Sequence, residues 1–404
     1  MKKYVFAIFF LLNICTGGFS FACTTAVISG KAIANGRPLL WKLRDADETE
    51  NCMRFFNDGK YTYIGLINSN DIEGKNVWAG ANSEGFAIMN NASFNVNIDD
   101  TVSLKDQEGV FMKLALQECA TLADFEKLLD NHPKPHGLAA NFGVIDGKGG
   151  AAYYEVDNYT YTKYDANDLE TAPHGYLVRT NFSFIGKKDV GYGYIRYQTA
   201  EEIFQRADVQ NKLNYRTIIQ EFSRCFYHPV INVDYREKYS KIPRGKNFVH
   251  SDDLIIRKGS VSSFIVQGIR DGEQADLSTI WTMVAFPETC VAVPVWVRGG
   301  DTLPKSLVYD KTIKTSRLNK YALEWKEKCY PIGRTDGYHY LNISELVNKE
   351  GTGFVQRIEK LENIIFNKTD KVLAVWRKKN PSEEQILDFY KEIDKLIDDF
   401  YKRE

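Results

Sequence analysis

The sequence predicts an α+β fold in which helices enclose β-sheets, on two observations. Segments with a strand pattern and segments with helical spacing follow one another in blocks: strands, helices, strands and helices again. Aromatic residues make up 13% of the 404 residues, which suggests much half-buried, stacked surface, as in a β-rich protein. This block order favours sheets sandwiched by helices over a doubly wound parallel sheet.

The first block combines β-branched residues with turn residues. Residues 24–29 and 38–41 read as two strands joined by a turn, and strand patterns follow at 61–68, 77–81 and 86–92. Between Phe111 and Leu129 the apolar residues recur at helical spacing, which predicts two helices. Cys119 falls within this pattern and is interpreted as a small buried hydrophobe.

The second half of the sequence also contains strand patterns and helical patterns in blocks. Its predicted strands are 141–145, 151–156, 176–180, 261–268, 279–285 and 291–297, and its predicted helices are 194–207 and 215–222. From Leu341 the pattern is mostly helical and ends in a helix over 383–403 whose apolar residues share one face. We therefore expect a main domain over residues 23–300 and a largely helical extension over 301–404 that docks on it.

Residues 1–22 have the features of an export signal. Lys2 and Lys3 precede an apolar run of about eleven residues, and Ser20-Phe21-Ala22 fits the small-x-small pattern of a signal-peptidase site. A membrane-spanning helix needs roughly 20 apolar residues, so the run is too short to remain in a bilayer. The prediction is an exported protein, periplasmic or secreted, with no integral membrane segment after processing.

Composition and spacing exclude several classes of partner and cofactor. Lys and Arg total 52 against 53 acidic residues, so the chain has no overall positive charge that would attract nucleic acid. The cysteines form no CxxC pair, and His132 and His136 flank prolines in a predicted turn, so we expect neither a metal nor a cofactor. The expected partner is a small molecule, and a homo-oligomer is compatible with the sequence.

Cys23 becomes the first residue of the chain if the cut falls after Ala22. A thiol attacks a carbonyl only as the thiolate, whereas an α-amine with a pKa near 7.7–8.0 can accept its proton. Cys23 would then carry nucleophile and base on one carbon, and no histidine is needed. The rival is a lipoprotein cysteine that is acylated and cannot catalyse, although the bulky Phe21 fits that signal poorly.

The stretch CTTAVISGKAIANGRPLLWKLRDAD resembles the start of the N-terminal-nucleophile (Ntn) cysteine hydrolases. More narrowly, it resembles the acyl-CoA:6-aminopenicillanate acyltransferase and carcinine hydrolase group, whose relatives are the choloylglycine hydrolases and penicillin V acylases. The similarity covers about residues 23–296. It implies a four-layer αββα sandwich, with the helical C-terminal extension outside the resemblance.

The resemblance also implies roles for the residues that end the second strand. Asp45 would accept a hydrogen bond from the Cys23 ammonium, with Asp47 as its near rival. Lys42 and Arg44, which precede Asp45, are expected to bind substrate. The bile-acid and penicillin enzymes usually have Arg where Lys42 stands, and Lys cannot make the same planar fork.

Further site residues follow from three later motifs. Asn82 opens the Asn-x-x-Gly-hydrophobic motif and is expected among the substrate-binding residues. One of Asn90 and Asn91 would donate to the oxyanion, as would Asn181 of the Thr-Asn segment. Arg196, at the start of a helix, would hold Asp45 or a substrate carboxylate.

The sequence as a whole predicts an exported cysteine amidohydrolase that cleaves linear, non-peptide C–N amide bonds of N-acyl compounds through an acyl-enzyme on Cys23. Acyl transfer to an amine or dipeptide cleavage on the same fold is the first alternative. The second is a lipid-anchored or secreted binding protein with an acylated Cys23.

Overall fold

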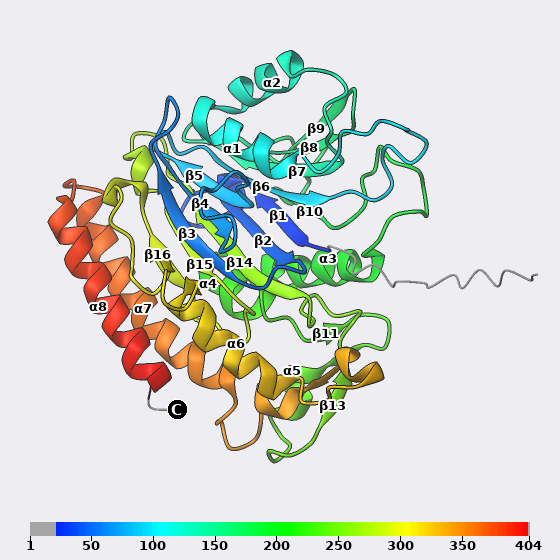
Figure 1. Ribbon diagram of the computed structural model, residues 1–404, viewed down its shortest axis with the longest axis vertical. Helices are drawn as coiled ribbons and strands as arrows, with labels where there is room; N and C mark the ends of the chain where they lie inside the picture. The colour runs from blue at the N-terminus through cyan, green and yellow to red at the C-terminus, as the bar shows by residue number, and fades with distance from the viewer. Residues whose placement is uncertain (1–21, 403–404) are drawn as a thin grey trace, which may run out of the picture.

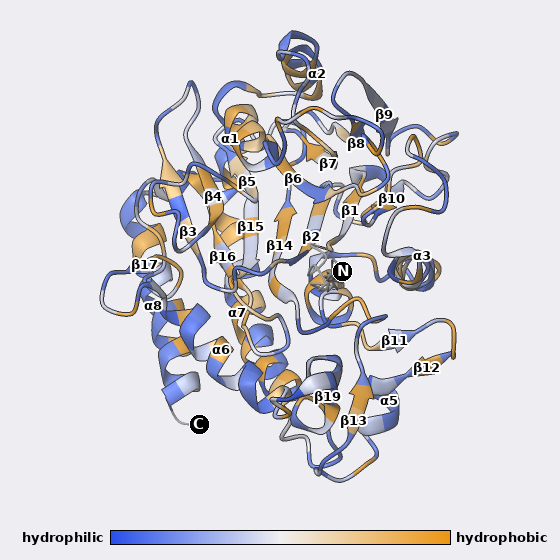
Figure 2. Ribbon diagram, turned by 45° about the vertical axis from the view of Figure 1, so that its right-hand side comes forward, coloured by the Kyte–Doolittle hydropathy of each residue, from blue (hydrophilic) through white to orange (hydrophobic). Residues whose placement is uncertain are grey.

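A computed structural model describes residues 22–402 of the chain (Figure 1). The signal-peptide prediction therefore lies outside the described residues except for Ala22. Two antiparallel sheets lie face to face, and helices cover the outer face of each. The predicted α+β class and the αββα order of layers are confirmed. Figure 2 shows apolar residues concentrated on the strands, with polar residues on the outer faces of the helices.

The first sheet has six strands, and Cys23 immediately precedes one of its central strands. In spatial order the strands are β10 (Tyr176–Arg179), β1 (Thr24–Ile28), β2 (Leu39–Asp45), β14 (Ser260–Gln267), β15 (Thr279–Met283) and β16 (Val293–Val295). Every residue of β1 and β2 is buried, because the second sheet covers one face and helices cover the other. A strand buried on both faces that still contains Lys, Arg and Asp is where a functional site is expected.

The second sheet has seven strands in sequence order. They are β3 (Asn51–Phe56), β4 (Tyr63–Asn68), β5 (Ala79–Asn82), β6 (Ala87–Ala92), β7 (Ala140–Ile145), β8 (Ala151–Val156) and β9 (Tyr161–Asp165). The two edge strands, β3 and β9, were not predicted from the sequence. The half-exposed β9 alternates little and is polar, as edge strands often are.

Helices α1 (Glu108–Glu118) and α2 (Leu122–Asn131) cover the second sheet, as Figure 1 shows at the top of the view. The prediction of two helices here is confirmed, but Cys119 follows α1 as its C-cap rather than lying within it. Phe86, Phe125 and Phe142 pack in the buried cluster beneath them, which also contains Cys119.

The remaining helices follow β10 in the chain, and some of them pack against the outer face of the first sheet. They are α3 (Tyr194–Val209), α4 (Tyr215–Thr217) continued by a π-helical turn (Ile218–Phe222), α5 (Tyr235–Tyr239), α6 (Arg317–Cys329), α7 (Phe354–Trp376) and α8 (Glu383–Lys402). Short ladders join β11 (Tyr227–His228) to β12 (Val233–Asp234), β13 (Phe248–His250) to β19 (Tyr340–Asn342), and β17 (Tyr309–Asp310) to β18 (Thr315–Ser316).

Helix α8 shows how the C-terminal extension attaches to the rest of the chain. Its buried face includes Ile386, Ile393 and Ile397, as the apolar stripe predicts. The Tyr390 Oη accepts a hydrogen bond from the backbone N–H of Trp296 at 2.9 Å, beyond the end of β16. The extension thus shares one hydrophobic core with the strands; the division at residue 300 remains a prediction.

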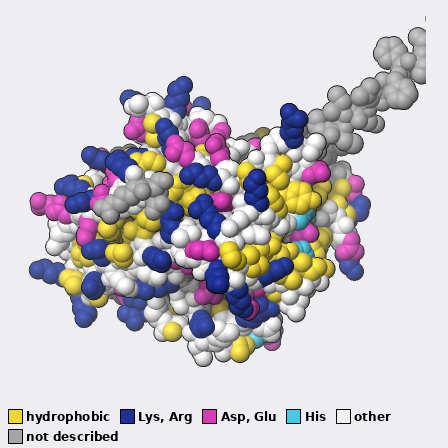
Figure 3. All heavy atoms as spheres, turned by 90° about the horizontal axis from the view of Figure 1, so that it is seen from below, with side chains coloured by type: hydrophobic (Ala, Val, Ile, Leu, Met, Phe, Trp, Pro, Cys, Tyr) yellow, Lys and Arg dark blue, Asp and Glu magenta, His cyan; other side chains and the backbone are white. Residues whose placement is uncertain are grey.

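Within residues 22–402, no helix is both long and apolar enough to cross a bilayer. On the face seen in Figure 3, basic and acidic side chains are interspersed.

Candidate active site

Cys23 lies at the end of β1, on the side that faces the second sheet. The alternation of side chains along a strand places Cys23 on the same face as Thr25. The Thr25 Oγ1 donates to Asn91 Oδ1 at 2.8 Å and accepts from Tyr153 Oη at 2.8 Å, and both partners belong to the second sheet. The thiol therefore points into the gap between the sheets, and Cys23 is 7% exposed.

Lys42 of β2 extends into the same gap. In the antiparallel register Lys42 lies opposite Thr25, so its side chain also faces the second sheet. Its Nζ donates to the Trp78 carbonyl at 2.8 Å and to Asn90 Oδ1 at 2.7 Å. Burial lowers the pKa of Lys42 to about 8, and the nearby Cys23 opposes this decrease.

Arg44 lies two residues further along β2, on the same face as Lys42. Its guanidinium donates to Asn51 Oδ1 at 2.7 Å and to Asn68 Oδ1 at 2.9 Å, and it stacks over the Trp78 ring. Burial lowers the pKa of Arg44 to about 10. Neither Arg44 nor Lys42 makes an ion pair with a carboxylate among residues 22–402.

Asp45 occupies the opposite face of β2. Its Oδ1 accepts a hydrogen bond from Ser260 Oγ at 2.6 Å, and its Oδ2 accepts from Arg257 Nη2 at 2.6 Å and Nε at 3.1 Å. The same Arg257 Nη2 donates to the Ala22 carbonyl at 3.1 Å. The Asp45–Arg257 pair is thus placed at the peptide bond that joins Ala22 to Cys23. Asp47, the rival considered from the sequence, is exposed.

Arg196 was expected to hold Asp45 or a substrate carboxylate, and the first of these roles is corrected because Arg196 makes no hydrogen bond to Asp45. Its Nη1 donates to the Cys23 carbonyl at 2.7 Å and to Thr24 Oγ1 at 3.0 Å, and its Nη2 donates to Asn181 Oδ1 at 2.9 Å. Arg196 is buried and fixes the backbone that carries Cys23. Burial and the neighbouring Arg257 lower its pKa to about 9.

The three candidate oxyanion donors differ in how far their amides are already used. Asn91 donates through Nδ2 to the Thr180 carbonyl, so it ties β6 to the start of the 180–183 segment. Asn181 Nδ2 donates to the Ala92 carbonyl at 2.9 Å. In Asn90 the Oδ1 accepts from Lys42, and the Nδ2 has no hydrogen-bond partner among residues 22–402. The structure therefore favours Asn90 as the donor.

Asn82 is the second correction. It lies at the end of β5, with its side chain on the outer, helix-covered face of the second sheet. Its Nδ2 donates to the carbonyls of Leu116 and Cys119, and its Oδ1 accepts from the N–H groups of Glu84 and Phe86. Every amide group of Asn82 thus serves to hold α1 and a turn, and none faces Cys23.

The other cysteines lack the surroundings of a nucleophile. Cys52, Cys119, Cys225, Cys290 and Cys329 are all buried. Burial raises the pKa of the Cys52 thiol to about 11 and those of Cys119, Cys225 and Cys290 to about 12. Such thiols stay protonated near neutral pH and are poor nucleophiles.

Two functional residues, Arg257 and Ser260, were missed in the sequence. Ser260 begins β14 and pairs with Asp45 in the antiparallel register, so the ladder itself brings the two side chains together. A strand was predicted to start at 261, but nothing in the sequence indicated that this strand pairs with residues 39–45. The signal that existed was a basic turn, Arg257-Lys258-Gly259, directly before a strand.

Two cavities border the site, and a third lies apart from it. A cavity of about 510 Å³ beside Asp45 is lined by Ala46, Asp47 and residues of the C-terminal extension, including Lys326 and Tyr338. Another of about 440 Å³ begins at Ala92, next to Asn90 and Asn91, and includes the half-buried Glu108, whose pKa is raised to about 7 by loss of hydration.

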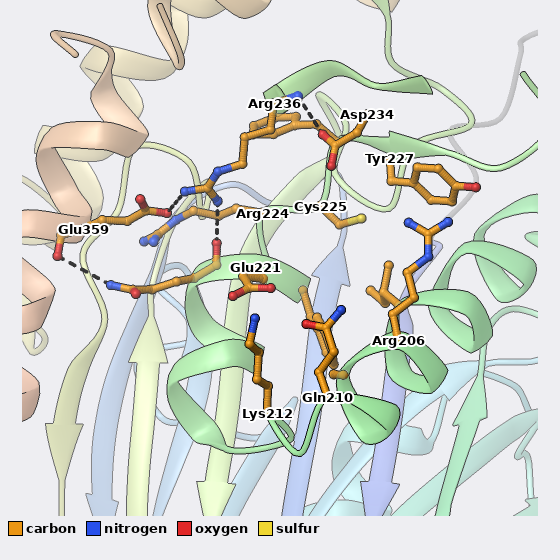
Figure 4. A pocket seen from close by; sticks show the side chains of 15 residues that line it. Arg206, Gln210, Lys212, Glu221, Arg224, Cys225, Tyr227, Asp234, Arg236 and Glu359 are labelled. Atoms are coloured by element: carbon orange, nitrogen blue, oxygen red, sulfur yellow. Dashed lines mark hydrogen bonds and ion pairs between the residues drawn. The ribbon is translucent and has the colours of Figure 1, made fainter. Parts of the chain in front are cut away.

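Figure 4 shows the third cavity, of about 430 Å³, among α3, the π-helical turn, α5 and α7. Its labelled walls are charged, with Arg206, Glu221, Arg236 and Glu359 among them. None of the predicted site residues lines it, so it is not the active site.

Residues 35–232 match the family model described as acyl-coenzyme A:6-aminopenicillanic acid acyl-transferase. The matched range includes every predicted site residue except Cys23, which precedes it. The resemblance to the acyltransferase group that was stated from the sequence is thereby confirmed over these residues, and the match supports the prediction that the chain is an enzyme. No curated protein matches the chain in sequence.

Several solved structures are similar to this chain. The Caenorhabditis elegans ortholog of N-acylethanolamine-hydrolyzing acid amidase has 15% identity and a TM-score of 0.40, over 65% of this chain and 99% of that one. A mutant conjugated bile acid hydrolase from Clostridium perfringens has 11% identity and a TM-score of 0.36, over 68% and 92%. Penicillin V acylase from Agrobacterium tumefaciens has 10% identity and a TM-score of 0.34, over 68% and 86%.

Proposed function

We propose that this protein is an exported cysteine amidohydrolase that cleaves the linear amide bond of an N-acyl compound through an acyl-enzyme on Cys23. Removal of residues 1–22 would give Cys23 a free α-amine. The reaction class agrees with the acyltransferase family, whereas the nucleophile and the export are the parts that experiment must establish.

The observation that carries the proposal is the place of the Ala22–Cys23 peptide bond. Arg257 contacts the carbonyl on one side of this bond, and Arg196 contacts the Cys23 carbonyl on the other. The new amine would therefore emerge beside Asp45, which Arg257 and Ser260 hold in place. A carboxylate there would orient the amine and stabilise it when it is protonated.

The thiol would meet a different environment. It faces Lys42 and Arg44, which hydrogen-bond only to neutral oxygens. Two such buried cations would stabilise a thiolate and the negative oxygen of a tetrahedral intermediate. This arrangement supports a thiolate nucleophile at Cys23.

The steps follow from these positions. The Cys23 amine takes the thiol proton, and the thiolate sulfur attacks the amide carbon, whose oxygen becomes an oxyanion that the Asn90 Nδ2 can bind. The C–N bond breaks as the Cys23 ammonium returns the proton to the leaving amine. A water molecule, deprotonated by the same amine, then attacks the thioester and releases the carboxylic acid and the thiol.

Acyl transfer is the second candidate, because the matched family is described as an acyl-transferase. The acyl-enzyme is common to both reactions, and only the acceptor differs: water in hydrolysis, an amine in transfer. Incubation with an N-acyl substrate and an excess of a second amine separates them, since transfer yields a new amide and hydrolysis yields only the free acid.

The test of the proposal is the state of the N-terminus. We expect N-terminal sequencing of the exported protein to begin at Cys23, and a chain that begins Met-Cys23 to be active only after the methionine is removed. A lipidated or blocked Cys23 would instead support a binding protein. Full activity of the uncleaved Met-Cys23 chain would exclude the α-amine as the base.

Activity should be measured on N-acyl amino acids, acyl-polyamines, penicillin V and conjugated bile acids. This panel varies the acyl group and the amine independently, so it also identifies the substrate class.

A further inference from the structure

Three side chains that bind metals readily meet at one point on the protein surface. His250 ends β13, Asp252 follows two residues later, and His339 ends the 3-10 helix Thr335–His339 of the C-terminal extension. The β13–β19 ladder fixes their separation, and the Ser251 N–H donates to the His339 carbonyl at 2.9 Å. Two segments about 90 positions apart in sequence thus contribute to one cluster.

The geometry of the cluster is that of a nearly formed metal site. One ligand atom from each residue lies within 4.8 Å of the other two. The Asp252 Oδ2 is 2.5 Å from His339 Nδ1 and 3.9 Å from His250 Nε2, and the two imidazole rings are stacked at 5.5 Å between centroids. The His339 Nδ1 is shielded from solvent and makes no hydrogen bond of acceptable geometry.

We propose that His250, Asp252 and His339 bind a divalent transition-metal ion of the zinc type. Two imidazoles and a carboxylate are ligands that zinc accepts at about 2.0–2.2 Å, and a three-residue set leaves a position for water. The three side chains are 38–52% exposed, so the ion can enter from solvent and keep its water. The sequence predicts no metal site, because the ligands form no local motif.

The plainer alternative is a histidine–carboxylate ion pair on the surface, and the chain contains such a pair for comparison. His174 Nδ1 lies 3.1 Å from Asp208 Oδ2 with a similar exposure, but it belongs to no group of three metal-binding side chains among the described residues. The two sites thus differ in the third ligand, which makes His174 a matched control.

An ion at this position would join the C-terminal extension to the Asp45 side of the catalytic site. Tyr338, next to His339, lies under the Lys258 ammonium at 4.9 Å, two residues from Ser260. The Asp252 carbonyl accepts a long hydrogen bond, 3.4 Å, from Arg257. The ion would therefore fix the segment that lines the cavity beside Asp45, and its removal should loosen that wall.

The experiment measures zinc binding directly, so it does not depend on the proposed function. Calorimetric titration uses tag-free Cys23→Ser protein, because the Cys23 thiol could itself bind zinc. We expect one equivalent of zinc to bind and cobalt substituted for it to show the intense visible absorption of a four-coordinate site. The His250→Asn/His339→Asn double variant should lose this binding by more than tenfold, while His174→Asn should keep it.

Asp252→Asn provides a second variant in case the double variant folds poorly, as judged by circular dichroism. This nearly isosteric change removes the anionic ligand and should weaken zinc binding at least tenfold. Equal binding to the parent protein, the double variant and Asp252→Asn would overturn the proposal, as would the absence of any stoichiometric binding to the parent.

Discussion

The two faces of β2 differ in charge: one carries two cations that make no ion pair, and the other carries a carboxylate paired with an arginine. On the face toward the second sheet, Lys42 and Arg44 are buried beside the thiol and hydrogen-bond only to neutral oxygens. On the other face, Asp45 is paired with Arg257 at the backbone of Cys23. Successive side chains of a strand alternate between its faces, so the four consecutive positions 42–45 suffice to separate the charges.

The difference between the two faces of β2 determines which charge each face can stabilise. A pair such as Asp45–Arg257 is already neutral, so it fixes geometry and accepts an ammonium without a large excess of charge. The cation face keeps a net positive charge in a region of low effective dielectric, where an added negative charge is strongly stabilised. Charge that develops during the reaction should therefore appear on the cation face.

The largest effect is expected at Cys23, whose thiol lies on the Lys42 and Arg44 side of β2 and whose backbone lies near Asp45. Cys23→Ser keeps the α-amine and a hydroxyl but replaces a good nucleophile by a poor one, so kcat/KM should fall by more than about 10³-fold. The fold should survive the near-isosteric change, which circular dichroism and the melting temperature will show. Near-normal turnover of the amide panel would remove Cys23 from the reaction.

Cys119→Ser is the control for this variant. The buried hydroxyl should lower the melting temperature, because a polar group replaces a small hydrophobe in the core beneath α1 and α2. Activity per folded molecule should not change.

The next effect compares neighbouring residues of β6. Asn90→Ala removes the amide whose Nδ2 is free to bind an oxyanion, so kcat should fall by about 10² to 10³ with little loss of stability. Asn91→Ala breaks hydrogen bonds to Thr25 and Thr180, so it should cost about 1–3 kcal/mol of unfolding free energy and change kcat little. The reverse pattern would assign the oxyanion to Asn91.

Much of this arrangement could be predicted from local sequence. The strand predicted over residues 38–41 is the beginning of β2, and the helical spacing between residues 111 and 129 gives α1 and α2. These features depend on neighbouring residues only, which is why their patterns were visible.

What escaped prediction depends on pairings between distant parts of the chain. Arg257 reaches Asp45 because β14 lies beside β2. In this ladder Asp45 pairs with Ser260, which is 215 positions away in the sequence. Arg196 was assigned to Asp45 or a substrate carboxylate, and it binds the Cys23 carbonyl; Asn82 was assigned to substrate although it holds α1. A motif gives the residue type that a site needs, but the sheet order decides which partner it meets.

A smaller effect on activity is expected on the face of β2 that carries Asp45. Arg257→Gln removes the charge-assisted hydrogen bonds that hold Asp45, which are worth about 1.5–3 kcal/mol, so kcat/KM should fall by about 10- to 100-fold. Arg298→Gln breaks a similar pair with Asp276 away from Cys23 and should leave kcat/KM unchanged. If both variants behave alike, the Asp45–Arg257 pair has no special place in the reaction.

The smallest effect concerns stability on the cation face. Burial disfavours the charged form of Lys42 and lowers its pKa from the ordinary lysine value of 10.5 to about 8 in the folded protein. Between these values the unfolded chain binds more protons at this site, so wild-type stability should rise with pH relative to Lys42→Met. The full difference in the pKa of Lys42 is 2.5 pH units, which corresponds to a change in unfolding free energy on the order of 3 kcal/mol. Urea unfolding of both proteins from pH 7 to 10.5 measures it, with the exposed Lys148→Met as control. If the difference in unfolding free energy between wild type and Lys42→Met stays constant over this range, as expected for Lys148→Met, then burial does not lower the pKa of Lys42.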